Sequence, residues 1–278
     1  MKKISRRSFM AAAAVSVAAL ALTACGGSAS SAASSVASSA ASSEAASSAA
    51  AADLSTVEAG KLTMATNAAF PPYEMTTDAG EFEGIDVDTA KAIAEKLGLE
   101  LQIDDMDFDA ALLSVQQGKA DIVMAGVTVT DERKAVMDFS DSYATGIQSI
   151  IVPEGSDIAS PDDLAGKKIG TQRGTTGYIY CSDDFGDENV VAYDDGLTAV
   201  QALNNGQVDA VVIDNAPAQE FVAANPGLKV LDTSYAEEDY AIGVAKGSAL
   251  EDAVNKALEE LKADGTLQAI VDKYINAN

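Results

Sequence analysis

Short apolar runs alternate with amphipathic helical patterns over residues 54–278, and this alternation limits the possible fold more than any other feature of the chain. Val87, Ile93 and Leu97 share one helical face, and Gly98 follows where a helix commonly ends. Strands that alternate with helices predict an α/β fold, with mainly parallel sheets covered by helices. The strand-like runs are residues 62–66, 99–103, 122–125, 148–152, 168–171, 190–193, 210–213, 229–231 and 241–245.

The first 24 residues have the pattern of an export signal. Basic residues from Lys2 to Arg7 precede an apolar stretch over residues 9–22, which is too short to span a bilayer comfortably. The stretch ends at Cys25, in a context that resembles a bacterial lipobox. We therefore predict a signal peptide over residues 1–24 and lipidation of Cys25. The pair Arg6 and Arg7 also resembles a twin-arginine signal, so the export route stays open.

The next segment has a composition that cannot form a core. Of the 27 residues in 26–52, 12 are Ala and 11 are Ser. We predict that residues 25–53 form a lipid-anchored linker with a reach of roughly 30 Å.

Charge and residue usage exclude several classes of function. The chain has 43 acidic and 18 basic residues and a net charge of −25, which argues against a nucleic-acid partner. It contains no histidine, so His-based triads and His-ligated zinc are excluded, and we expect no metal and no cofactor. If Cys25 is lipidated, Cys181 has no disulfide partner, and we interpret it as a small buried hydrophobic residue.

Two segments of the chain resemble each other at a distance of 88 residues. Residues 111–123 and 199–211 both read as a helix, a glycine, an aspartate and a buried strand. This suggests two lobes of related architecture. Ligands bind at the carboxyl ends of strands in such sheets, so two facing lobes would form one cleft.

Polar and aromatic residues follow several of the predicted strands. A proline-rich loop presents Phe70, and Arg133 lies shortly after the run 122–125. Thr175 and Thr176 stand at a predicted helix N-terminus, which is an anion-binding arrangement. Asp214 follows the run 210–213. An arginine and an anion site suit a carboxylate and an aspartate suits an ammonium, so the ligand would be an α-amino acid.

The motifs of the chain resemble those of the polar amino acid solute-binding proteins, the lipoprotein components of ABC importers. The resemblance implies a periplasmic-binding-protein type 2 architecture, with two lobes joined by two crossing strands. We expect lobe 1 at 54–147 and 246–278, and lobe 2 at 148–245. The motifs are Phe70-Pro71-Pro72-Tyr73-Glu74, Gly84-Ile85-Asp86-Val87-Asp88, Gly118-Lys119-Ala120-Asp121, Gly126-Val127-Thr128-Val129-Thr130-Asp131-Glu132-Arg133, Asp138-Phe139-Ser140, Gly174-Thr175-Thr176-Gly177 and Ala263-Asp264-Gly265-Thr266.

The same resemblance implies roles for individual residues. Arg133, Thr128 and Thr176 would hold the α-carboxylate of the ligand. The Gly126 carbonyl and Asp214 would hold its α-ammonium. Phe70 and Phe108 would flank the side chain. Asn67 stands where relatives often have Asp, which weakens an assignment to a cationic side chain.

The implied function is capture of a free polar L-amino acid outside the cytoplasm and its delivery to an ABC permease, by a monomer anchored to the membrane. Two alternatives stay open, because a fold does not determine a function. One is a ligand-sensing lipoprotein that serves no importer. The other is a dehydratase-like enzyme, for which Glu74 would be the first candidate acid. The sequence leaves the identity of the amino acid open.

Overall fold

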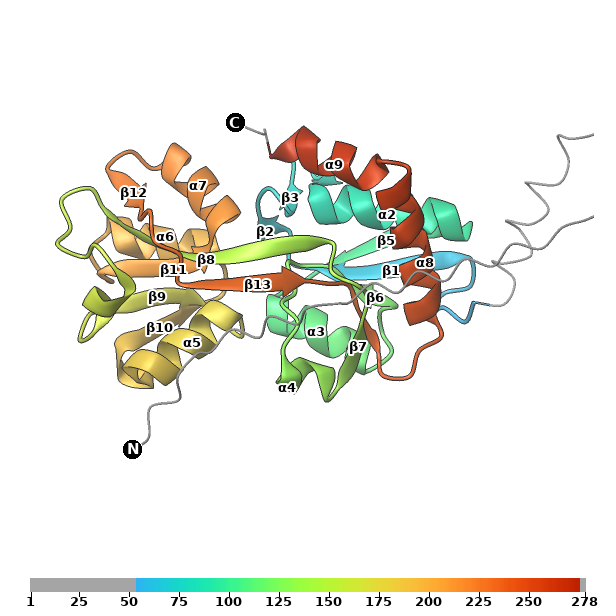
Figure 1. Cartoon of the computed structure of the whole chain (residues 1–278), viewed down its shortest axis with the longest axis horizontal. Helices are drawn as coiled ribbons and strands as arrows, with labels where there is room; N and C mark the ends of the chain where they lie inside the picture. The colour runs from blue at the N-terminus through green and yellow to red at the C-terminus, as the bar shows by residue number, and fades with distance from the viewer. Residues whose placement is uncertain (1–53, 276–278) are drawn as a thin grey trace, which may run out of the picture. The chain divides into compact units, whose positions relative to one another are not determined.

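The computed structural model describes residues 54–275, which form two α/β lobes (Figure 1). The predicted signal peptide, Cys25 and the linker lie outside the described residues. Within the described part of the chain, no helix is long and apolar enough to cross a membrane.

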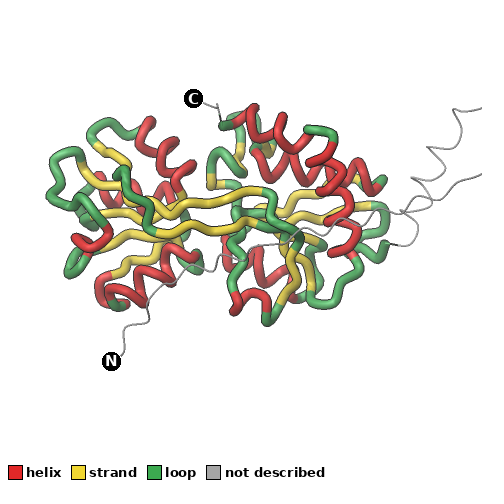
Figure 2. The backbone as a smooth tube through the Cα atoms, in the orientation of Figure 1, coloured by secondary structure: helices red, strands yellow, loops and turns green. Residues whose placement is uncertain are grey.

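Lobe 1 is built on a five-stranded sheet with helices on both faces (Figure 2). Its strands, in order across the sheet, are β5 (Glu100–Asp105), β1 (Lys61–Thr66), β6 (Ile122–Val123), β14 (Gly243–Ala245) and β7 (Met137–Phe139). The first three are parallel, and β14 runs antiparallel to β6 and β7. The helices are α2 (Ile85–Leu97), α3 (Phe108–Gln116), α4 (Asp131–Lys134), α8 (Leu250–Ala263) and α9 (Thr266–Tyr274).

The two faces of this sheet have separate cores because side chains alternate along a strand. Leu62 and Met64 of β1 pack with the buried faces of α2 and α8. Ala65 points to the other side and packs with α3. A small separate sheet of β2 (Ala69–Phe70), β3 (Glu74–Thr76) and β4 (Phe82–Glu83) carries Phe70 and Glu74.

Lobe 2 repeats this plan with three parallel strands at one side of its sheet. The strands, in order, are β10 (Val190–Tyr193), β9 (Ile169–Gln172), β11 (Ala210–Asp214), β8 (Ala144–Pro153) and β12 (Leu228–Val230), and β13 (Ala236–Tyr240) also pairs with β8. Helix α5 (Thr176–Phe185) covers one face, and α6 (Gly196–Asn204) and α7 (Asn215–Ala224) cover the other. Cys181 on α5 is fully buried, as predicted, and burial raises the pKa of its thiol to about 12. Two 3₁₀ turns, η1 (Pro161–Leu164) and η2 (Asp187–Asn189), complete the lobe.

The similarity between residues 111–123 and 199–211 corresponds to a repeated structure. Gly118 ends the turn after α3 and Gly206 ends the turn after α6, both with φ of 66°. Asp121 accepts a hydrogen bond from the Thr63 backbone N–H at 2.7 Å, and Asp209 accepts one from the Lys168 N–H at 2.8 Å. In each lobe the aspartate therefore ties the start of one strand to its neighbour.

Two antiparallel strands connect the lobes. Strand β8 pairs with β13 from Ala144↔Tyr240 to Gln148↔Ala236, and the two run side by side between the lobes (Figure 1). Tyr240, at one end of this ladder, also forms an isolated bridge with Thr128 of lobe 1.

Two expectations from the sequence need correction. The expected strand over 241–245 is shorter, because β14 spans Gly243–Ala245, and it pairs with strands of lobe 1 although the expected boundary placed these residues in lobe 2. Strand β13 escaped notice because Glu237, Glu238 and Asp239 give it no apolar character. Ser248 and Glu251 have the spacing of a capping box, but the box does not form, because α8 begins at Leu250 and Ser248 Oγ accepts a hydrogen bond from Leu250 N.

Candidate functional site

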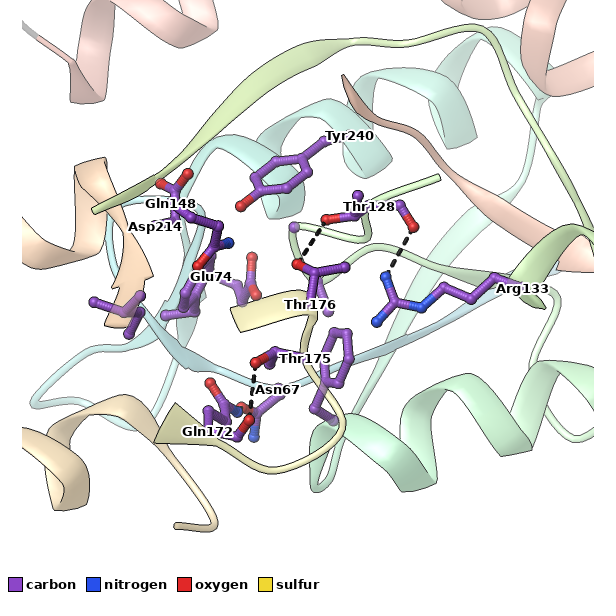
Figure 3. A pocket seen from close by; sticks show the side chains of 15 residues that line it. Asn67, Glu74, Thr128, Arg133, Gln148, Gln172, Thr175, Thr176, Asp214 and Tyr240 are labelled. Atoms are coloured by element: carbon purple, nitrogen blue, oxygen red, sulfur yellow. Dashed lines mark hydrogen bonds between the residues drawn. The ribbon is translucent and has the colours of Figure 1, made fainter. Parts of the chain in front are cut away.

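A pocket lies between the lobes, where strands of both sheets end beside the crossing strands β8 and β13 (Figure 3). All eight residues predicted to contact a ligand line it: Phe70, Phe108, Gly126, Thr128, Arg133, Thr175, Thr176 and Asp214. Their roles toward a ligand remain predictions. The other lining residues are Asn67, Glu74, Ala125, Gln148, Gln172, Ile213 and Tyr240.

Arg133 brings a buried positive charge to the pocket. Its backbone N–H donates to Thr130 Oγ1, which caps the N-terminus of the short helix α4. Nη1 donates to the Thr128 carbonyl at 2.8 Å, and the guanidinium lies 5.3 Å from the centre of the Phe108 ring. Burial lowers the pKa of Arg133, and among the described residues no carboxylate forms an ion pair with it. A buried cation with neutral partners alone is suited to bind an anion.

The loop after β9 supplies the N-terminus of α5. Thr175 is the N-cap, and its hydroxyl oxygen accepts from the Tyr178 N–H. Gly174 has φ of 74°, and a Cβ at this position would collide with the Asp109 carboxylate of lobe 1. The positive φ favours glycine at this position, whereas the exposed Asp109 side chain could turn away from an added methyl group.

Asp214 caps the N-terminus of α7 on the opposite side of the pocket from Arg133 (Figure 3). Its oxygens accept from the backbone N–H groups of Ile147, at 2.7 Å, and Ala216, at 3.0 Å. Burial raises the pKa of Asp214 to about 6, although these two hydrogen bonds act in the other direction. A carboxylate that is buried without a cation suits an ammonium ligand.

Gly126 lies between two aromatic rings. Its φ is 55°, and an added Cβ would lie 2.8 Å from the Phe70 ring and 3.2 Å from the Tyr240 ring. Its N–H donates to Asp86 Oδ2 at 3.0 Å. The residue thus allows the backbone to line the pocket directly.

Glu74 and Asp86 form a buried acidic pair that we did not assign to the binding site from the sequence. Neither is exposed, and among the described residues no N–H or hydroxyl group donates to either oxygen of Glu74, which shares a hydrogen bond with the carboxyl group of Asp86 alone. Burial, increased by the nearby charge of Asp86, raises the pKa of Glu74 well above its usual value. Burial also raises the pKa of Asp86 to about 6, while hydrogen bonds from Gly126 and Tyr143 lower it.

Direct contacts between the lobes close the pocket. Gln172 Nε2 donates to Asn67 Oδ1 at 2.8 Å, and Arg133 Nη2 donates to the Gly174 carbonyl at 3.2 Å. The hydroxyl oxygens of Thr128 and Thr176 lie 3.4 Å apart (Figure 3).

Sequence reasoning missed lining residues of two kinds. Gln172 is the last residue of β9, so the rule that sites lie at strand ends could have found it. Gln148 and Tyr240 lie on the crossing strands, and no local pattern indicated that these strands would pass the pocket.

The chain matches the bacterial extracellular solute-binding proteins, family 3, over residues 62–277. It belongs to this family. A probable histidine-binding protein of Neisseria gonorrhoeae is 35% identical, over 95% of this chain and 94% of the relative. A structure of an ancestral arginine-binding protein bound to glutamine is 43% identical in sequence with a TM-score of 0.75. The match covers 78% of this chain and 98% of the ancestral protein. The arginine-, lysine-, histidine-binding protein ArtJ of Geobacillus stearothermophilus is 35% identical with a TM-score of 0.75, over 78% and 96% of the two chains. The two-lobed fold is thus that of type 2 periplasmic binding proteins, and the protein is a solute-binding protein.

Proposed function

We propose that this solute-binding protein captures a free polar L-α-amino acid and delivers it to an ABC importer. The observation that carries the proposal is the pocket between the lobes, in which neither Arg133 nor Asp214 forms an ion pair with another described residue. An α-amino acid supplies both charges at a fixed separation. The amino-acid-binding relatives support this ligand class.

The acidic pair favours a ligand whose side chain carries N–H donors, with arginine as the first candidate. Asp214 serves the ammonium in this proposal, which leaves Glu74 with two buried oxygens that no N–H group of the described residues satisfies. A guanidinium would donate to both oxygens and favour the ionised form of Glu74, whose pKa is raised by burial in the empty protein. Asn67, which stands where relatives often have Asp, is occupied by hydrogen bonds to Gln172 and to the Met106 carbonyl. Glu74 could therefore serve the cationic side chain in place of an aspartate at position 67.

Isothermal titration with the mature protein tests this proposal. We expect L-arginine to bind in 1:1 ratio, whereas its amidated and N-acetylated forms, which each lack one charge, should bind at least a hundredfold more weakly. Glu74→Gln should weaken the binding of L-arginine by tenfold or more. It should change the affinity for L-glutamine far less, since an amide side chain brings no charge to be compensated. Equal affinity for blocked and free forms would contradict the site.

We further propose that the mature protein is held outside the cytoplasm by a lipid on Cys25, as the lipobox resemblance implies. Cys25→Ser should then release the protein into the soluble fraction. A variant that still requires detergent for extraction would show that the anchor lies elsewhere.

The enzymatic and sensory alternatives predict different outcomes. A dehydratase would consume the bound amino acid, with Glu74 as the acid, so incubation followed by chromatography should reveal product. We expect the ligand to be recovered unchanged. A sensor would not support uptake, so deletion of the gene should leave amino acid import intact, whereas we expect import to fall.

A further inference from the structure

Glu238 is a buried carboxylate at the junction of the two lobes that the proposed ligand contacts do not use. It lies on the crossing strand β13 with 6% of its surface exposed, although Glu237 and Asp239 on either side are exposed. The alternation of side chains along a strand turns Glu238 inward between these two acidic neighbours.

One oxygen of Glu238 collects hydrogen bonds from three different parts of the molecule. Oε2 accepts from Thr128 Oγ1 of lobe 1 at 3.1 Å and from Thr176 Oγ1 of lobe 2 at 3.0 Å. It also accepts from Gln148 Nε2 of the other crossing strand at 2.9 Å. The three donors line the pocket.

These bonds determine what the two threonines can offer to a ligand. A carboxylate oxygen accepts, and both bonds to Glu238 are shorter than the 3.4 Å between the two hydroxyl oxygens, so each hydroxyl donates its single proton to Glu238 rather than to the other threonine. Only lone pairs remain on the two oxygens. Acceptors suit the ammonium of an amino acid, and would repel its carboxylate.

We propose that Glu238 is a positioning residue that fixes the hydroxyl protons of Thr128 and Thr176, so that one oxygen from each lobe accepts a hydrogen bond from the ligand ammonium as the lobes close. The inference rests on the proposed function. It assigns these hydroxyls to the ammonium rather than to the carboxylate, and leaves the carboxylate to Arg133 and to backbone N–H groups. The negative charge of Glu238 also counteracts the effect of burial on the pKa of Arg133.

Paired probes separate this role from a general structural one. We would compare the binding affinity of L-arginine with that of 5-guanidinopentanoate, and the binding affinity of L-glutamine with that of 5-amino-5-oxopentanoate. Each analogue keeps the carboxylate and the side chain of its amino acid but lacks the ammonium. In Glu238→Gln the new amide can donate to a threonine oxygen and turn a hydroxyl proton toward the ligand. Affinity for the amino acid that the wild type binds should fall about tenfold to a hundredfold. The deaminated analogue, measured by competition, should change less than threefold.

Glu237→Gln is the matched control, since it makes the same substitution at an exposed position on the same strand. It should bind as the wild type does. The double variant Thr128→Val with Thr176→Val tests the role without altering Glu238. It removes both acceptors, and should also weaken the amino acid while sparing the analogue. Circular dichroism and thermal unfolding verify that each variant is folded.

The outcomes distinguish the two proposals. If Glu238→Gln binds the amino acid within threefold of the wild type, or weakens both members of a pair equally, the positioning role is overturned and the proposed function stands. If the wild type binds no free amino acid, the proposed function fails, and the role of Glu238 fails with it.

Discussion

At the scale of single residues, the pocket holds buried ionisable groups that its own side chains do not pair. Arg133 has backbone carbonyls as its hydrogen-bond partners, and no cation of the described residues forms an ion pair with Asp214 or Glu74. Such groups cost free energy in the empty protein, and a ligand with complementary charges removes that cost. Binding should therefore depend on a few residues to an unusual degree.

Arg133→Ala should weaken amino acid binding roughly a hundredfold to a few thousandfold, because removal of one partner of a buried ion pair costs about 3–5 kcal/mol. Arg133→Lys should recover part of the loss, since an ammonium cannot donate two parallel hydrogen bonds to a carboxylate. Asp214→Asn should lose affinity for the corresponding reason. Isothermal titration measures each variant.

Arg173→Ala is the control, because the Arg173 side chain is 57% exposed and lies outside the pocket lining. The carboxylate site would be assigned to the wrong arginine if the affinity of Arg133→Ala stayed within a few-fold of the wild type. The same would follow if Arg173→Ala lost its affinity for the amino acid.

The raised pKa of Asp86 predicts a loss of stability of the ligand-free protein as pH rises. Its pKa is about 6 in the folded protein, above the ordinary 3.8, so the folded state binds more protons than the unfolded state between these values. The stability that this group contributes is complete below pH 4 and is lost as pH rises through 6. A shift of about two units corresponds to roughly 3 kcal/mol.

Thermal unfolding of Asp86→Asn across pH 4–8 tests this linkage. The variant should unfold at a higher temperature than the wild type at pH 7.5, and the difference should shrink toward pH 4. Glu95→Gln, at an exposed position on the same helix, should follow the wild type at every pH. A difference between Asp86→Asn and the wild type that does not vary with pH would show that ionisation of Asp86 has no such effect.

At the scale of elements, each lobe repeats a unit of helix, glycine, aspartate and strand. The unit matters for stability because its aspartate satisfies backbone N–H groups at the start of a neighbouring strand. The two copies differ in burial, since Asp121 is 5% exposed while Asp209 is exposed. Asp121 also accepts a second hydrogen bond, from the Val57 N–H at 2.8 Å.

Asp121→Ala should lower the free energy of unfolding by about 1–3 kcal/mol, because it leaves a buried N–H group without a partner. Asp209→Ala should cost less than about 1 kcal/mol, since water can replace the lost acceptor at an exposed site. Denaturant unfolding at pH 7 measures both variants. Equal costs would contradict the importance that we assign to burial.

At the scale of the whole described molecule, the central feature is the direct contact between the two lobes. The bond from Gln172 to Asn67 and the bond from Arg133 to Gly174 both cross the cleft. At Gly174 the backbone also lies close to the exposed side chain of Asp109 of the other lobe.

Gly174→Ala should lower stability about as much as Gly166→Ala, because both variants place a Cβ at a positive φ, 74° and 75°. Affinity for the amino acid should change less than about threefold in both variants, since the exposed Asp109 side chain can turn away from the new methyl group. Thermal unfolding and isothermal titration measure both variants. A loss of affinity of tenfold or more in Gly174→Ala alone would show that the contact with Asp109 cannot relax.

The sequence by itself determined the α/β fold, the family and the eight residues expected at the site, because each depends on local patterns. Apolar periodicity indicates strands and helices, and the loops after strands carry the Phe70, Arg133, Thr176 and Asp214 motifs in order. The glycine after the amphipathic pattern also predicted that the helix ends at Gly98, and the left-handed φ of 71° at this residue confirms it.

Only the tertiary structure decided which groups face one another across the cleft. Strand β13 has no apolar pattern, so nothing local showed that Glu238 would turn inward and meet threonines 110 and 62 residues away. The pair of Glu74 and Asp86 joins two motifs that are separate in the sequence. Their pKa values are raised by burial, which a sequence does not contain. Contacts between distant segments depend on how the lobes pack, and packing is a property of the folded chain alone.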